Sequence, residues 1–169
     1  EAAGADGLVL CTNTMHRVAP AIEAAVTLPL LHIADPTVQA IRRAGLTTVG
    51  LLGTRFTMEQ DFYRRRLTDR HGLTVIVPDP VDRETVHRVI YDELCRGQVR
   101  EDARAHYRRI IQQLVEAGAE GIILGCTEIA LLVGPDEAPV PLFDTPALHA
   151  RAAAAWALGD AEERPPPPR

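Results

Sequence analysis

Lysine and long hydrophobic runs are both absent from the sequence. All 18 basic residues are arginine. An enzyme that forms a Schiff base or binds pyridoxal phosphate needs a lysine amine, so this chain supplies none for that chemistry. The longest apolar run, Ala152 to Leu158, is less than half of the ~18 residues that a membrane-spanning helix requires. These two absences exclude lysine-based cofactor chemistry and indicate that the chain does not span a membrane.

Clustered positive charge and paired cysteines are scarce as well. The formal net charge is -5, and three widely spaced cysteines form no CxxC pair. Nucleic acids and anionic membranes bind clusters of positive charge, so neither is an expected partner. An odd number of isolated cysteines argues against a disulfide framework and a zinc site. The first residues, EAAGADG, lack the basic and apolar regions of a signal peptide, so we expect a cytoplasmic protein without a metal ion.

Short apolar runs alternate with helical patterns along most of the chain. This alternation is typical of mostly parallel sheets flanked by helices, and it predicts an α/β fold. The clearest helix is expected at Arg100 to Ala117; a second begins near Thr57, and a third spans Asp82 to Cys95. The Pro-rich residues after Gly159 are expected to be a disordered tail. Strands are predicted at Gly7 to Cys11, Pro29 to Ile33, Thr48 to Gly53, Leu73 to Val77, Gly121 to Gly125 and Val140 to Phe143.

One pattern in the sequence occurs twice. GADGLVL leads into Cys11 and Thr12, and GAEGIILG leads into Cys126 and Thr127. Each copy is typical of a helix stop, a turn and a buried strand, followed by a Cys-Thr pair where the strand gives way to a helix. Open α/β sheets bind ligands at such strand ends. The repeat therefore predicts two pseudo-symmetric halves with a cleft between them, lined by one thiol from each half.

Two thiols on opposite sides of a cleft suit acid-base chemistry at a carbon stereocentre. The N-terminus of a helix lowers the pKa of a nearby thiol, so both cysteines are expected to be usable bases. The same backbone N–H groups, with the hydroxyls of Thr12, Thr14 and Thr127, form a cradle for a carboxylate. One thiol can remove the α-proton of a bound amino acid while the other delivers a proton to the opposite face. The reaction inverts the stereocentre and requires no cofactor.

Five co-linear segments resemble the aspartate/glutamate racemase family of cofactor-independent amino-acid racemases. The likeness runs from Gly4 to about Leu158. It implies two α/β halves related by a pseudo-two-fold axis, with Cys11 and Cys126 as the acid/base pair between them. It also suggests a small amino acid as substrate and a homodimer, and it implies that the substrate is held by Asn13, Thr14, Thr57 and Thr127. The five segments are LVLCTNTMH (Leu8 to His16), LLGTRFTM (Leu51 to Met58), YDELCRG (Tyr91 to Gly97), ILGCTEI (Ile123 to Ile129) and PLFDT (Pro141 to Thr145).

Several candidate site residues have a second interpretation. Thr54 and Thr57 suit a turn and a helix N-cap as well as a substrate site. Glu128 can complement a helix dipole or tune the neighbouring thiol. Arg96 falls where related racemases place a basic residue for the side-chain carboxylate, and the alternative is a surface residue at a helix end. Cys95 is most simply a packing residue at the end of an amphipathic helix.

The start of the sequence departs from the family pattern. Family members begin with a strand and a Gly-rich loop well upstream of the first catalytic cysteine, and no such segment precedes Cys11 here. We therefore expect residues 1–34 and 144–158 to be an incomplete first α/β domain and residues 35–143 to be a second one, followed by a tail at 159–169. The chain as printed is expected to be inactive and prone to association.

Three functions are consistent with these patterns. The favoured one is racemisation of aspartate or glutamate by proton transfer between two cysteines. A related isomerase, such as a hydantoin racemase or a maleate isomerase, is the enzymatic alternative. The third is a catalytically silent relative that binds a small carboxylate. A charge that recognises a second carboxylate, as Arg96 would provide, distinguishes the first function from the second.

Overall fold

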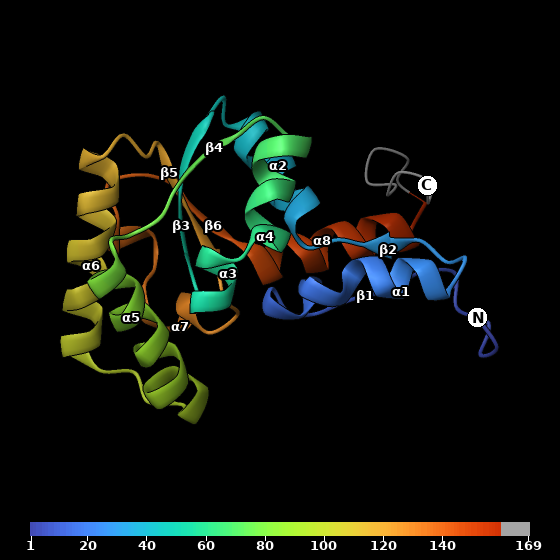
Figure 1. The fold of residues 1–169 in the computed structure, drawn as a ribbon, viewed down its shortest axis with the longest axis horizontal. Helices are drawn as coiled ribbons and strands as arrows, with labels where there is room; N and C mark the ends of the chain where they lie inside the picture. The colour runs from blue at the N-terminus through green and yellow to red at the C-terminus, as the bar shows by residue number, and fades with distance from the viewer. Residues whose placement is uncertain (160–169) are drawn as a thin grey trace.

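The structure, a computed structural model, describes residues 1–159 as two parallel sheets with helices around them (Figure 1). The predicted tail, apart from Gly159, lies outside the described residues. None of the described helices is long and apolar enough to cross a membrane. The strands are β1 (Leu8–Val9), β2 (Leu30–Leu31), β3 (Thr48–Gly53), β4 (Thr74–Ile76), β5 (Gly121–Gly125) and β6 (Leu142–Asp144). The α-helices are α1 (Ala19–Ala25), α2 (Ala34–Arg43), α3 (Arg55–Glu59), α4 (Asp61–Arg65), α5 (Pro80–Arg88), α6 (Glu101–Glu116), α7 (Ile129–Leu132) and α8 (Thr145–Ala157). Tighter or wider helical turns are η1 (Thr14–Val18), η2 (Arg66–Arg70), η3 (Val89–Glu93), η4 (Leu94–Arg96) and η5 (Pro135–Glu137).

The larger sheet has four parallel strands in the order β4-β3-β5-β6. Its central pair runs in register, from Val49 opposite Gly121 to Gly53 opposite Gly125. Both central strands are buried along nearly their whole length, as expected when helices cover both faces of a parallel sheet. The predicted bounds of these two strands are confirmed. The two outer strands are shorter than predicted and lie within or beside the predicted ranges.

Side chains from the central strands alternate between the two faces of the larger sheet. Leu52 and Ile122 pack in a core with residues of α5, α6 and α7. Leu51 and Ile123 pack in a second core with residues of α2 and α4. Figure 1 shows α5 and α6 on one side of the sheet and α2 and α4 on the other. This three-layer arrangement leaves the C-terminal ends of β3 and β5 side by side at one edge, where α/β sheets bind ligands.

The smaller sheet contains only β1 and β2, which pair in parallel. These strands lie beside α1 and α8, at the right of Figure 1. Leu30 and Leu31 in β2 are buried, whereas Val9 in β1 is 42% exposed. The strands predicted at Gly7 to Cys11 and at Pro29 to Ile33 are both too long, because β1 and β2 have two residues each. Within the described residues β1 pairs on one side only, and an edge strand loses regular geometry where that single partner ends.

Helix α8 links the two sheets. It packs on α2, contacts β5 and β6, and places Trp156 against Gly7 just before β1. An added Cβ at Gly7 would overlap the indole ring, so a glycine is required at this close approach. The predicted division places α8 in one unit with residues 1–34, but its contacts with α2, β5 and β6 are with elements of the predicted second unit, residues 35–143. That division remains a prediction.

Two predicted helices differ from the expectation. The segment predicted as one helix from Asp82 to Cys95 is α5 followed by the π turn η3 and the 3₁₀ turn η4. The helix predicted near Thr57 is interrupted at Gln60, whose extended backbone separates α3 from α4. The π turn and the 3₁₀ turn differ from an α-helix in their rotation per residue. The side chains of this segment therefore point in other directions than they would on a regular α-helix. Tyr91 and Cys95 consequently face the strand ends of the larger sheet.

Candidate active site

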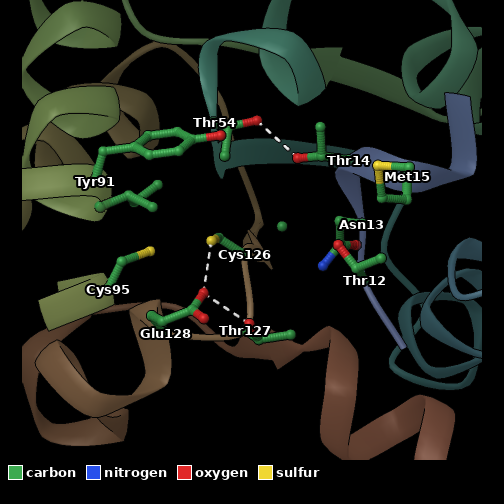
Figure 2. Close-up of a pocket in the computed structure, with 12 residues that line it drawn as sticks. Thr12, Asn13, Thr14, Met15, Thr54, Tyr91, Cys95, Cys126, Thr127 and Glu128 are labelled. Atoms are coloured by element: carbon green, nitrogen blue, oxygen red, sulfur yellow. Dashed lines mark hydrogen bonds between the residues drawn. The ribbon is translucent and has the colours of Figure 1, made fainter. Parts of the chain in front are cut away.

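A pocket opens at the C-terminal ends of β3 and β5, facing the segment that follows β1 (Figure 2). Its volume is about 250 Å³. Pockets for drug-sized ligands span roughly 300–1,000 Å³, so this one suits a smaller molecule. Its lining combines residues predicted for the site with others that were not. The lining residues are Thr12, Asn13, Thr14, Met15, Thr54, Ile90, Tyr91, Cys95, Gly125, Cys126, Thr127 and Glu128.

Cys126 follows β5 directly and forms a hydrogen-bonded pair with Glu128 (Figure 2). The thiol donates to Glu128 Oε2 over 2.9 Å, and the Thr127 hydroxyl donates to the same oxygen over 2.7 Å. Burial, and next the carboxylate of Glu128, raise the pKa of the Cys126 thiol to about 12. Burial alone would raise the pKa of Glu128, but the two donated hydrogen bonds outweigh it and lower that pKa. At neutral pH the pair is a protonated thiol beside a carboxylate.

The expectation that a helix N-terminus lowers the pKa of this thiol is wrong. The helix that follows Cys126 is α7, which has only four residues and begins at Ile129. The dipole of so short a helix is weak, whereas burial and an adjacent carboxylate act on the sulfur directly. Two roles were open for Glu128: complementing a helix dipole or tuning the thiol. This geometry agrees with the second role. The Cys126 thiol therefore keeps its proton at neutral pH.

Replacing Glu128 with glutamine is expected to lower the pKa of the Cys126 thiol and to speed its alkylation. The negative charge that opposes thiolate formation is removed, while burial continues to oppose it. Each unit by which the pKa falls raises the thiolate fraction about tenfold below that pKa. The measurement is the rate of iodoacetamide alkylation at Cys126 between pH 8 and 10, followed by mass spectrometry. Glu116→Gln, on the exposed face of α6, is the matched control, and equal rates in the two variants would contradict the assignment.

The opposite wall of the pocket is the segment 12–14, tied to β5 by a buried relay. Asn13 Nδ2 donates to Thr145 Oγ1 over 2.9 Å, and that hydroxyl donates to the Leu124 carbonyl over 2.8 Å. Asn13 and Thr145 are both buried. Leu124 lies in β5, two residues before Cys126. The relay therefore fixes the position of this wall relative to the thiol.

Threonine hydroxyls hold the same wall against the end of β3. Thr14 Oγ1 lies 2.9 Å from Thr54 Oγ1 and 3.3 Å from Thr57 Oγ1. Thr54 is also the N-cap of α3, where its hydroxyl accepts a hydrogen bond from the Thr57 N–H. Thr57 is fully buried and lies behind the lining of the pocket. The capping interpretation is confirmed for Thr54, and the geometry favours a structural role for Thr57.

Cys11 and Arg96 lie outside the set of described residues that line the pocket. Cys11 is exposed, and its sulfur lies 4.0 Å from the Val9 carbonyl oxygen. Arg96 is exposed at the end of η4. The pairing of Cys11 with Cys126 and the clamp role of Arg96 stay predictions. The position of Arg96 favours its alternative as a surface residue.

One wall of the pocket is not predicted by the sequence motifs. Figure 2 shows Tyr91 and Cys95 on one side of Cys126, with Thr12 and Asn13 on the other. Cys95 was expected to pack in the core, but it is exposed and lines the pocket. Burial, and next the charge of Glu128, raise its pKa. No regular helical spacing marks this wall, because Tyr91 lies in the π turn η3 and Cys95 in the 3₁₀ turn η4.

Known proteins resemble this chain along almost its whole length. The sequence profile of the family described as Asp/Glu/Hydantoin racemase matches residues 1–153. A structure from Yersinia pestis, described as a candidate Asp/Glu racemase, is 59% identical with a TM-score of 0.89, covering 93% of this chain and 68% of that one. PH1733 from Pyrococcus horikoshii, described as an aspartate racemase homologue, is 34% identical with a TM-score of 0.82, covering 93% and 69%. RacX of Bacillus subtilis, named a broad specificity amino-acid racemase, is 26% identical over 89% of this chain and 64% of its own length.

These comparisons agree with the architecture described above. The chain spans about two thirds of the length of the relatives that it matches. The neighbours share its arrangement of parallel sheets flanked by helices, which confirms the predicted fold class. The family profile covers far more than half of the residues, including the Cys126 turn and the segment 12–14. The chain belongs to the Asp/Glu/Hydantoin racemase family.

Proposed function

We propose that this protein is an isomerase that racemises small amino acids, with aspartate and glutamate as its substrates and no cofactor. One observation carries the proposal. The pocket places the Cys126 thiol, with its proton held toward Glu128, across from a wall of hydroxyl and amide groups at residues 12–14. Racemisation needs a proton donor on one face of the carbon and a base on the other, and the Cys126 thiol supplies the donor. The family to which the chain belongs supports the same reaction class.

The amide of Asn13 supports an amino-acid ligand. Thr145 gives its hydroxyl proton to Leu124, so its oxygen must accept from Asn13 and the Nδ2 of Asn13 is committed to that bond. Asn13 Oδ1 is then buried without a hydrogen-bond partner among the described residues. An unsatisfied acceptor beside a pocket is costly unless a ligand supplies a donor. The α-ammonium group of an amino acid is such a donor, and the hydroxyl of Thr12 suits its carboxylate. Thr14 and Thr54 line the same pocket with their hydroxyls paired with each other, and the Thr127 hydroxyl is paired with Glu128.

The proposed reaction removes a proton from one face of the α-carbon and adds a proton to the other face. A base on one face takes the α-proton and leaves a planar carbanion, and an acid on the other face returns a proton to the same carbon. Cys126 begins as the acid, because its thiol is protonated at neutral pH. Thr12 of the opposing segment lines the pocket, and Cys11 directly precedes it in the chain. We assign the base on the second face to Cys11, whose thiol a turn of this segment would bring into the pocket.

Other parts of the proposal rest on resemblance. The name of RacX describes broad specificity, so neutral amino acids belong among the substrates to be tested. A homodimer and a cytoplasmic location are proposed for the same reason, by analogy with the family. Nucleic acid is not a proposed partner, because the net charge of -5 disfavours it.

The test is exchange of the α-proton with deuterated water. Each enantiomer of aspartate, glutamate and alanine, and a substituted hydantoin, is incubated with the full-length protein and followed by proton NMR and chiral chromatography. The expected result is loss of the α-proton signal together with the appearance of the opposite enantiomer of aspartate or glutamate. Exchange with the hydantoin alone would identify the alternative isomerase. Binding without exchange for every compound would identify a catalytically silent relative and contradict the proposal.

A further inference from the structure

His16 lies behind the segment 12–14, with both of its ring nitrogens engaged. Its Nδ1 lies 2.6 Å from the Thr12 carbonyl oxygen, and the Ile33 N–H donates to its Nε2 over 3.1 Å. A carbonyl oxygen can only accept, so Nδ1 carries the ring proton and Nε2 is the acceptor. The ring is 1% exposed. His16 is therefore a neutral imidazole in one defined tautomer that joins the pocket wall to the chain between β2 and α2.

The surroundings of His16 keep it in that state. Its ring centroid lies 4.1 Å from that of His32 and 6.3 Å from that of His149. His32 Nδ1 accepts from the Ala34 N–H, and His149 donates to the Leu31 carbonyl. Burial lowers the pKa of His16 to about 4. The charges of His149 and Arg66 also lower this pKa, whereas the carboxylate of Asp35 raises it. All three histidines thus take part in hydrogen bonds, and the ring of His16 also packs on the other two.

We propose that His16 is a positioning residue for racemisation: its Nδ1–H holds the Thr12 carbonyl and so sets the peptide from which the Thr12 and Asn13 side chains enter the pocket. The inference rests on the proposed function. The Thr12 carbonyl and the Asn13 N–H belong to one planar peptide, so fixing the carbonyl orients both neighbouring residues. The Asn13 relay then holds the segment from its other side. A displacement of ~1 Å at reacting groups can lower a rate by about 10²-fold.

The two edges of the ring have separable roles, and two substitutions distinguish them. Asparagine has an amide nitrogen near the position of Nδ1, so His16→Asn can still donate to the Thr12 carbonyl while losing the Ile33 contact. Glutamine has an amide oxygen near the position of Nε2, so His16→Gln can still accept from Ile33 N–H while losing the Thr12 contact. If His16 acts through Thr12, the asparagine variant is expected to keep kcat within about fivefold of the parent protein and the glutamine variant to lose about 10²-fold.

The experiment measures kcat, KM and thermal unfolding for the parent protein and both variants, together with the amide NMR shift of Asn13. The expected result is a loss of kcat in His16→Gln with little change in KM, and an Asn13 shift that moves in His16→Gln but not in His16→Asn. Activities that follow the loss of thermal stability, with His16→Asn no better than His16→Gln, would overturn the inference. A parent protein without racemase activity would contradict the proposed function instead. The Asn13 shifts would then decide whether His16 sets the wall.

Discussion

Replacing Cys126 with serine is expected to lower the rate of racemisation by roughly 10²–10⁴-fold, the range contributed by general acid-base groups. Serine has nearly the same shape and can still donate to Glu128, but its hydroxyl gives up a proton far less readily than a thiol does. The fold is expected to be retained, because the change is nearly isosteric and the turn after β5 stays packed. The measurement is kcat/KM for the best substrate, with thermal unfolding as the check on folding.

Substitutions at Cys11 and Thr12 test the groups that serve the second face of the substrate carbon. Cys11 is the proposed base and Thr12 lines the pocket, so Cys11→Ala is expected to lower activity more than Thr12→Val. Undiminished activity in Cys11→Ala would show that the segment does not turn inward and that another group serves this face. A folded Cys126→Ser protein with undiminished activity would remove the thiol from the mechanism altogether.

Replacing Gly125 with alanine is expected to destabilise the protein by about 1–3 kcal/mol, the usual cost of overpacking a buried site. An added Cβ would lie 2.8 Å from the Leu52 carbonyl oxygen and 3.0 Å from a methyl carbon of Leu51. The first of these is backbone of the neighbouring strand and has little freedom to move. Separating β5 from β3 at this point also displaces Cys126, so activity is expected to fall with stability. Chemical denaturation monitored by circular dichroism gives the change in free energy of unfolding.

Gly134→Ala is the matched control for the Gly125 substitution. A Cβ there would lie 3.2 Å from the Glu137 carboxylate, which is the end of a flexible side chain. The backbone at Gly134 is extended, with φ of -115°, so alanine is compatible with it. We expect a loss of under about 1 kcal/mol at this position. Equal losses at the two glycines would show that the contact between β3 and β5 is not as close as described.

The sequence predicted most of what depends on local pattern. The central strands β3 and β5 are continuous apolar runs bounded by turns, and their ends were correct to the residue. The duplicated strand and Cys-Thr pattern located the turn that carries Cys126, and the spacing of apolar residues located α6 to within a residue at each end. These features depend on neighbours in the chain, whose periodicity is visible in the sequence.

What the sequence left out depends on packing between distant segments. The bond between Asn13 and Thr145 joins residues 132 positions apart and exists only because α8 returns beside β5. The widened turn at η3, which brings Tyr91 into the pocket, has no periodic signature. The raised pKa of Cys126 follows from burial, which a strand-to-helix pattern does not specify. The same pattern placed Cys11 in the cleft, whereas the short strand β1 ends before it.

The central claim is that two different groups serve the two faces of the substrate carbon. It is tested most directly by running the reaction in deuterated water and analysing both enantiomers within the first tenth of conversion. If a group on each wall of the pocket serves one face of the carbon, the product carries one solvent deuterium at its α-carbon while the remaining substrate keeps its proton. Deuterium appearing equally in substrate and product would show that one group serves both faces, and would contradict the account.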